Sequence, residues 1–162
     1  MDVLILITGG TLDKVHDTVT ESLVFEGGSK SRVSNILKTG RTDHPRLKVL
    51  MKKDSLDMTE EDRVVILRAV IDAPQERIVI THGTGTMELT AKHLKGKVGD
   101  KTVILTGAMR PQSLGKSDAG FNLGGAIIAA QTMTQGVYAV MNGRVFDADQ
   151  VHKDTALGRF DV

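Results

Sequence analysis

Cysteine and tryptophan are absent from the 162-residue sequence, and aromatic residues are scarce, with four Phe and one Tyr. Without cysteine the chain can form no disulfide and has no thiolate to serve as a nucleophile. Proteins that bind single-stranded nucleic acid usually stack its bases on aromatic side chains. The shortage of aromatics therefore argues against that class.

The charge balance and the hydrophobic runs argue against two further classes. Lys and Arg total 21 and Asp and Glu total 20, so the formal net charge of +1 shows no basic excess for binding nucleic acid. No apolar run approaches the length that spans a bilayer, and Met1-Asp2 leads into the first run without a basic leader. We expect one domain, residues 1–162, of a cytoplasmic enzyme or binding protein without nucleic-acid or membrane partners.

Short Val/Ile/Leu runs alternate with longer amphipathic stretches. The runs are Val3–Thr8, Leu47–Met51, Arg77–Thr81, Thr102–Thr106 and Val137–Met141. They lack polar alternation, which is typical of strands covered on both faces. Helical patterns follow a weak capping box at Thr59–Asp62 and cover Met87–Leu94 and Phe121–Met133. This order predicts an α/β fold, a Rossmann-like parallel sheet flanked by helices.

Segments rich in glycine and threonine follow most of the predicted strands. They read TGGT (8–11), DS (54–55), THGTGT (81–86), TGAMRP (106–111) and MNGR (141–144). In open parallel sheets, ligands bind at the carboxyl ends of the strands. A single glycine turn is usually structural, but three of similar composition at one edge favour a binding or catalytic site.

Residues 12–34 interrupt the alternation with a polar stretch that contains TESLVFEGGSKS. A segment this long without periodicity is either a mobile active-site loop, which we assign, or a disordered surface excursion. The tail after Phe146 is also polar, and we expect it to be only partly ordered.

Four segments resemble the successive signatures of bacterial L-asparaginases, the threonine amidohydrolase family. They are ITGGTLD, DSLDMTEED, ITHGTGTMELTA and LTGAMRPQSLGKSDAGFNL, in the family's order, and the likeness extends from Met1 to about Lys153. The resemblance implies the catalytic N-terminal domain of the family without its C-terminal domain. It also implies hydrolysis of L-asparagine to L-aspartate and ammonia, through a threonine nucleophile and a β-aspartyl ester.

The resemblance assigns roles residue by residue. Thr11 matches the nucleophile, and Thr84 and Lys153 match the threonine–lysine pair that relays its protons. The positions that match substrate contacts are Ser55 for the α-carboxylate, Ala108 through its carbonyl for the side-chain amide, Gly85 for the α-ammonium, and Gly10 and Gly83 beside the oxyanion-hole N–H groups. Simpler alternatives remain, because Ser55 and Thr84 could cap helices and Lys153 could be a solvated charge.

Two positions depart from the family pattern. Gly85 stands where the family has an aspartate that binds the α-ammonium, and losing that charge-assisted hydrogen bond costs about 1.5–3 kcal/mol. We therefore expect weakened or absent activity. The family's loop tyrosine is also missing, since the loop has Phe25 and the one tyrosine, Tyr138, falls in a predicted strand. Glu21, on the same loop, is a candidate replacement base.

Two other functions stay open. A nucleotide-binding protein is weakly indicated, because the Walker pattern around Gly115–Ser117 has Arg110 in place of its first glycine and GTGTME ends on Glu88. A non-catalytic amino-acid binder that keeps the pocket is the second. We expect no cofactor, and no metal, because no His pair has ligand spacing. The Ala/Gly-rich helical stretch at 121–133 favours a homo-oligomer, a dimer or tetramer.

Overall fold

The computed structural model describes residues 2–161, and six strands of this part form one sheet. In spatial order they are β4 (Arg46–Lys53), β1 (Val3–Gly9), β5 (Arg77–Thr81), β6 (Thr102–Thr106), β7 (Gly136–Met141) and β8 (Arg144–Asp147). Neighbours from β4 to β7 run parallel, and β8 is antiparallel to β7. The predicted α/β class and all five predicted strands are confirmed.

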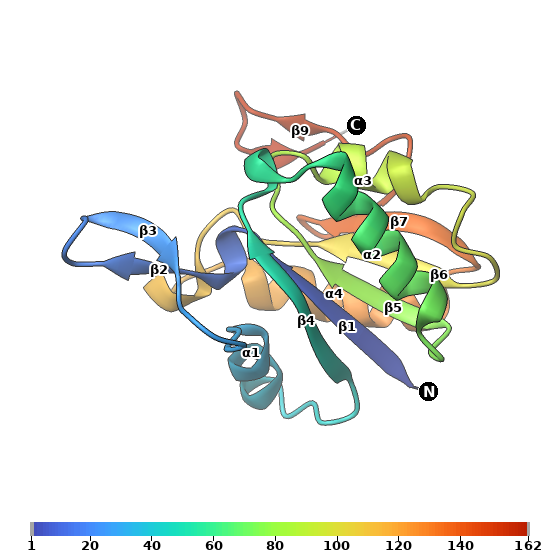
Figure 1. Ribbon diagram of the computed structural model, residues 1–162, viewed down its shortest axis with the longest axis horizontal. Helices are drawn as coiled ribbons and strands as arrows, with labels where there is room; N and C mark the ends of the chain where they lie inside the picture. Colours follow the sequence, from blue (N-terminus) through green and yellow to red (C-terminus); the bar gives the residue numbers. More distant parts are fainter. Residues whose placement is uncertain (1, 162) are drawn as a thin grey trace.

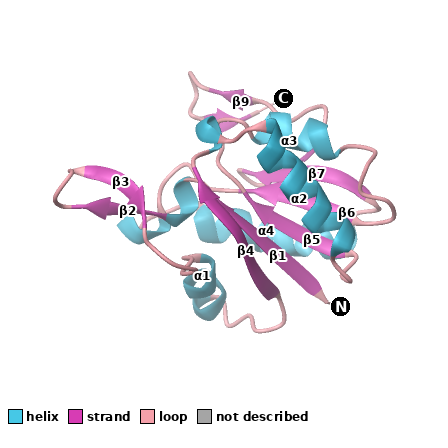
Figure 2. Ribbon diagram, viewed as in Figure 1, coloured by secondary structure: helices cyan, strands magenta, loops and turns pink. Residues whose placement is uncertain are grey.

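Helices cover both faces of this sheet. They are α1 (Val33–Thr39), α2 (Glu60–Asp72), α3 (Met87–Leu94) and α4 (Ala119–Thr132). Figures 1 and 2 show α2 and α3 in front of the sheet and α4 behind it. The alternation of β1 explains this arrangement: Leu4 and Leu6 pack in the core under α2 and α3, whereas Ile5 and Ile7 pack in the core with α1 and α4. Both sets are apolar, so the sequence shows no polar alternation.

The predicted helices begin and end close to where their capping patterns place them. The Thr59 hydroxyl accepts from Asp62 N (3.3 Å) and the Asp62 carboxylate accepts from Thr59 N (2.9 Å), which completes the capping box of α2. The helix α3 has the predicted bounds, and α4 begins two residues before Phe121. The short helix α1 was not predicted, because seven residues carry too little periodicity.

The segment 12–34 contains a β-hairpin, which its sequence did not predict. After the 3-10 turn η1 (Thr11–Asp13), β2 (Lys14–Asp17) pairs with β3 (Ser22–Phe25), and the hairpin projects from the domain (Figure 1). Asp13 holds its base, accepting from Ser31 Oγ (2.8 Å) and Arg32 N (2.6 Å). Burial raises the pKa of the Asp13 carboxyl. The segment is thus tied to the domain at Asp13.

The end of the chain also contains regular structure beyond the prediction. MNGR, interpreted from the sequence as one of the site segments, forms a tight turn between β7 and β8, with Asn142 at φ 54° and Gly143 at φ 75°. Asn-Gly with both φ values positive is the usual two-residue hairpin turn. Farther on, β9 (Lys153–Asp154) pairs with β10 (Arg159–Phe160). The predicted partly ordered tail is therefore a second small hairpin.

Among residues 2–161, no helix combines the length and apolar character needed to cross a membrane.

Candidate active site at the carboxyl edge of the sheet

The loops after β1, β4 and β5 meet because β1 lies between the other two strands. A Cβ atom at Gly10 would lie 2.5 Å from Gly83 N, and a Cβ atom at Gly83 would lie 2.6 Å from both Cβ and Oγ of Ser55. Neither position has room for a side chain. Three of the predicted substrate-contact residues, Gly10, Gly83 and Ser55, therefore lie closely packed against one another.

The two predicted catalytic threonines flank this junction. Thr11 begins η1 directly after Gly10 and is partly exposed, and Thr84 directly follows Gly83. Because Gly10 and Gly83 touch, Thr11 and Thr84 emerge from adjacent loops at the same edge of the sheet.

The remaining threonines at the strand ends have a different role. Thr8 Oγ1 donates to Thr81 O (2.7 Å) and Thr106 Oγ1 donates to Val140 O (2.8 Å), and all three threonines are fully buried. These bonds join neighbouring strands. The threonine content of the strand-end segments therefore has two causes, which the sequence alone did not separate.

Lys153 lies beside Thr84. Its Nζ donates a hydrogen bond to Thr84 Oγ1 at 2.9 Å, across 69 residues of sequence. The hairpin that carries it is held by buried Val151 and Phe160 and by a bond from Phe160 N to Asn142 Oδ1 (2.8 Å). A docked hairpin thus places this lysine at the site.

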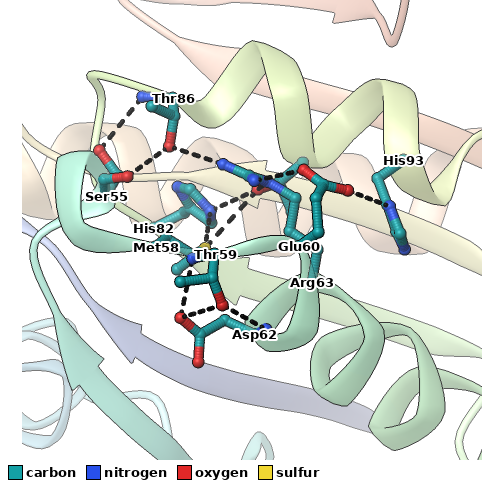
Figure 3. A network of polar contacts seen from close by, with 10 residues as sticks. Ser55, Met58, Thr59, Glu60, Asp62, Arg63, His82, Thr86 and His93 are labelled. Carbon is teal, nitrogen blue, oxygen red and sulfur yellow. Dashed lines mark hydrogen bonds and ion pairs between the residues drawn. The ribbon is translucent and has the colours of Figure 1, made fainter.

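Ser55 lies beneath the loop that follows β5 (Figure 3). Its hydroxyl accepts from Thr86 N (3.1 Å), its carbonyl accepts from Thr86 Oγ1 (2.7 Å), and the residue is 1% exposed. The preceding Asp54 caps the short turn η2 (Ser55–Asp57) through a bond from Leu56 N (3.0 Å). The N-cap of this turn is therefore Asp54 and not Ser55, whose hydroxyl contacts Thr86.

Gly85 lies against a hydrocarbon side chain. A Cβ atom at this position would lie 2.8 Å from Leu56 Cδ2 and 3.2 Å from Ser55 Oγ. Leu56 is 75% exposed, so its terminal methyl groups have room to move aside. The position at which the family pattern has an aspartate thus has an exposed leucine as its neighbour in this chain.

Sequence reasoning assigned no role to two charged residues at this edge, Asp54 and Lys14. Lys14 forms an ion pair with Asp54. Its hydrogen bond lowers the pKa of the Asp54 carboxyl, and the Leu56 N–H and the charge of Lys153 add to the effect. The ionised carboxylate therefore lies within the fields of both lysines. An Asp before a turn is common and does not by itself indicate an ion pair. The pair is recognised only in the structure, which brings Lys14 next to Asp54.

Ala108 belongs to the loop after β6 and is buried. Asp118 holds the loop by accepting from Met109 N (2.9 Å) and Arg110 N (3.0 Å), and Asn122 Nδ2 donates to Gly107 O (3.0 Å). These two side chains explain why the SDAGFNL segment accompanies GAMRP in the sequence.

The candidate loop residues are not brought to the threonines. Glu21 lies in the exposed turn at the far end of the β2–β3 hairpin, with φ 54° (Figure 1). Phe25 lies at the hairpin base, where the Lys14 ammonium is 5.6 Å from its ring centroid. Tyr138 lies within β7, as predicted, and pairs with Asp147 of β8.

His82 is fully buried behind the junction. Its Nδ1–H donates to Gly83 O (2.7 Å), because a carbonyl oxygen can only accept, and Nε2 then accepts from the Thr90 hydroxyl (2.7 Å). Burial lowers the pKa of His82 to about 4, so the ring is neutral at neutral pH. It serves as a hydrogen-bonding support for the Gly83 carbonyl.

This lowered pKa predicts a pH-dependent stability. In the unfolded chain His82 takes up a proton below the ordinary histidine pKa of 6.5, whereas in the folded chain it does so only near pH 4. The free energy of unfolding should therefore fall by up to about 3 kcal/mol from this residue as the pH drops through that window. Urea unfolding at pH 7 and pH 4.5 measures it. A His82→Asn variant should lose part of that slope, and an unchanged slope would contradict the assignment.

Within the described residues no group of three or more His, Asp or Glu side chains could hold a metal ion.

Comparison with known proteins places the chain among similar sequences and structures. The family model described as "Asparaginase, N-terminal" matches residues 2–160. L-asparaginase 2 of Escherichia coli (strain K12) is 32% identical over 94% of this chain and 46% of its own length. L-asparaginase of Thermococcus kodakarensis is 33% identical over 98% of this chain and 49% of its own length. The solved structure of the thermostable L-asparaginase from Thermococcus kodakarensis superposes with a TM-score of 0.82 at 28% identity, covering 99% of this chain and 51% of that one. The chain therefore spans about half the length of these relatives.

Proposed function

Because the chain belongs to the asparaginase family, we propose that it hydrolyses L-asparagine to L-aspartate and ammonia. The observation that supports this most directly is the hydrogen bond of 2.9 Å between Lys153 Nζ and Thr84 Oγ1. A lysine and a threonine 69 residues apart have no local reason to meet. Their contact lies next to the Gly10–Gly83 junction that carries Thr11.

In the proposed reaction, Thr11 Oγ1 attacks the side-chain amide carbon of the substrate. The Thr84–Lys153 pair takes the hydroxyl proton and returns it to the leaving nitrogen, so that ammonia departs and a β-aspartyl ester remains on Thr11. Water then attacks the ester, and the same pair takes its proton and restores the Thr11 hydroxyl. Backbone N–H groups beside Gly10 and Gly83 stabilise the oxyanion of both tetrahedral intermediates.

The substrate is held by the surrounding loops. We assign the α-carboxylate to the Ser55 hydroxyl, which Thr86 N already orients, with the positive charge of Lys14 nearby. The side-chain amide contacts the carbonyl of Ala108. For Glu21 to act as a base, the β2–β3 hairpin would have to fold over Thr11, since its turn lies at the far end of the hairpin (Figure 1). Release of ammonia from L-asparagine, followed in a coupled assay, tests the proposal.

Gly85 favours a second candidate, an amino-acid binder without catalysis. The acid nearest in sequence to Ser55, Asp54, already accepts from Lys14 Nζ and Leu56 N. Gly85 offers the α-ammonium of asparagine no carboxylate, and Asp54 is already engaged by these two donors. Binding of L-asparagine without release of ammonia would support this candidate over the hydrolase.

Replacing Gly85 with aspartate should raise kcat/KM for L-asparagine by about 10- to 100-fold, because it supplies a charge-assisted hydrogen bond to the α-ammonium. Leu56 must move, since a Cβ atom at position 85 would lie 2.8 Å from its Cδ2. The variant is therefore also made with Leu56→Ala.

Gly85→Asn is the matched control, because it has the same size without the charge. An equal gain in the asparagine variant would assign the effect to packing. No gain in either aspartate variant would reject the role of position 85.

We also propose that the chain forms a homo-oligomer, a dimer or tetramer. The support is α4, whose sequence AGFNLGGAIIAAQT has no charged residue. Its Phe121 is 70% exposed and its Ile128 is 61% exposed, so the helix presents an apolar outer face.

A further inference from the structure

Behind the site lies a buried guanidinium that the proposed chemistry does not use. Arg63, on α2, is 3% exposed and forms an ion pair with Glu60 (2.6 Å), whose side chain is 69% exposed (Figure 3). Burying a guanidinium costs its hydration free energy, so arginines this buried are almost always paired through their N–H donors. Two of its other N–H groups point to threonine hydroxyls.

The first of these contacts leads to Ser55. Arg63 Nη2 donates to Thr86 Oγ1 at 3.3 Å, and Thr86 Oγ1 donates to Ser55 O at 2.7 Å (Figure 3). Thr86 N donates in turn to Ser55 Oγ at 3.1 Å. Because Ser55 O can only accept, the Thr86 hydroxyl directs its proton at that carbonyl and accepts from Arg63 through a lone pair.

The second contact leads to the loop that carries Thr84. Arg63 Nε donates to Thr90 Oγ1 at 3.2 Å, and the Thr90 hydroxyl donates to His82 Nε2 at 2.7 Å. His82 Nδ1–H then donates to Gly83 O at 2.7 Å. Because a trans peptide directs its C=O and N–H to opposite sides, holding Gly83 O behind the site turns the Thr84 N–H away from His82.

We infer that Arg63 is a positioning residue that sets both sides of the site at once, Ser55 through Thr86 and the Gly83–Thr84 peptide through Thr90 and His82. In both series of hydrogen bonds the donors point outward from the guanidinium. Its loss therefore removes the bond that each threonine hydroxyl accepts and leaves that hydroxyl held only by the proton it donates. The inference rests on the proposed function, in which Ser55 binds the substrate and the Thr84 loop supports the reaction.

The test compares Arg63→Met with Thr86→Val, Thr90→Val and a matched control, Arg77→Met. Arg77 makes the same kind of bond, from Nη1 to Thr102 Oγ1 at 2.8 Å, at the opposite edge of the sheet. Thr86→Val should raise KM for L-asparagine by about 5-fold or more and Thr90→Val should lower kcat by a similar factor, as expected for the loss of one buried hydrogen bond. Arg63→Met should do both, and Arg77→Met neither.

A double variant and amide NMR spectra distinguish a positioning role of Arg63 from a role in stability alone. The double variant Arg63→Met/Thr86→Val should have a KM no higher than the higher of the two single-variant values, because both substitutions break the same series of hydrogen bonds. The amide resonances of Thr84 and Thr86 should shift in Arg63→Met and stay unchanged in Arg77→Met. If Arg63→Met does not fold, the two threonine variants carry the same test.

Unmoved amide resonances, or a lower melting temperature with unchanged KM and kcat, would overturn the role of Arg63. A wild-type chain that releases no ammonia would instead reject the hydrolase. In that case the dissociation constant of L-aspartate, measured by NMR titration, replaces KM, and an unchanged constant in Arg63→Met and Thr86→Val overturns the inference.

Discussion

Replacing Thr11 with valine is expected to lower kcat for ammonia release from L-asparagine by at least about 1,000-fold, because in the proposed reaction the Thr11 hydroxyl forms the ester intermediate. Valine keeps the shape of threonine and removes only the hydroxyl. Thr11 is partly exposed and begins a short turn, so the change should cost little stability. Intact-mass measurement of acid-quenched protein should find an aspartyl adduct on the wild-type chain and none on the variant.

Thr8→Val is the matched control for this experiment. Thr8 belongs to the same TGGT segment, but its hydroxyl donates to Thr81 O within the sheet. Its loss should cost about 1 kcal/mol of stability and leave turnover unchanged. Turnover retained in Thr11→Val, or an adduct found on another residue, would reject Thr11 as the nucleophile.

Replacing Lys153 with methionine is expected to lower kcat by about 100- to 10,000-fold, the range for the loss of a general acid–base group. Methionine keeps the length and apolar stem of the side chain but cannot donate to Thr84 Oγ1 or exchange a proton with it. Since Ser55 and Thr86 are untouched, KM should change much less than kcat. Steady-state kinetics with L-asparagine over a range of pH gives both constants.

Arg159→Met controls for the hairpin that carries Lys153. Arg159 lies on the paired strand β10 opposite Asp154 and bonds to Asp161 (2.8 Å), so its side chain lies on the other face of the hairpin from that of Lys153. A kcat that falls equally in both variants would assign the effect to undocking of the hairpin. If Lys153→Met keeps wild-type kcat, the proton relay must use another group.

The site residues differ in how far the sequence could predict them. Gly10, Gly83 and Ser55 follow strands that local hydrophobicity marks clearly, so strand order alone brought them to one edge. The MNGR segment was assigned to the site because it too follows a predicted strand. It forms a hairpin turn instead, in which Asn142 and Gly143 both adopt positive φ. Asn-Gly between two apolar runs is a local signal that could have predicted β8.

The sequence by itself determined the parallel sheet, the helices α2 to α4 and the family signatures, because each depends on the periodicity or spacing of residues near one another in the chain. The tertiary structure alone decided which threonines join strands and which flank the Gly10–Gly83 junction. It also brought Lys153 to Thr84, Lys14 to Asp54 and Arg63 to the back of both loops. Those contacts join residues 23 to 69 positions apart, and they depend on how the hairpins and helices dock, which no local pattern encodes.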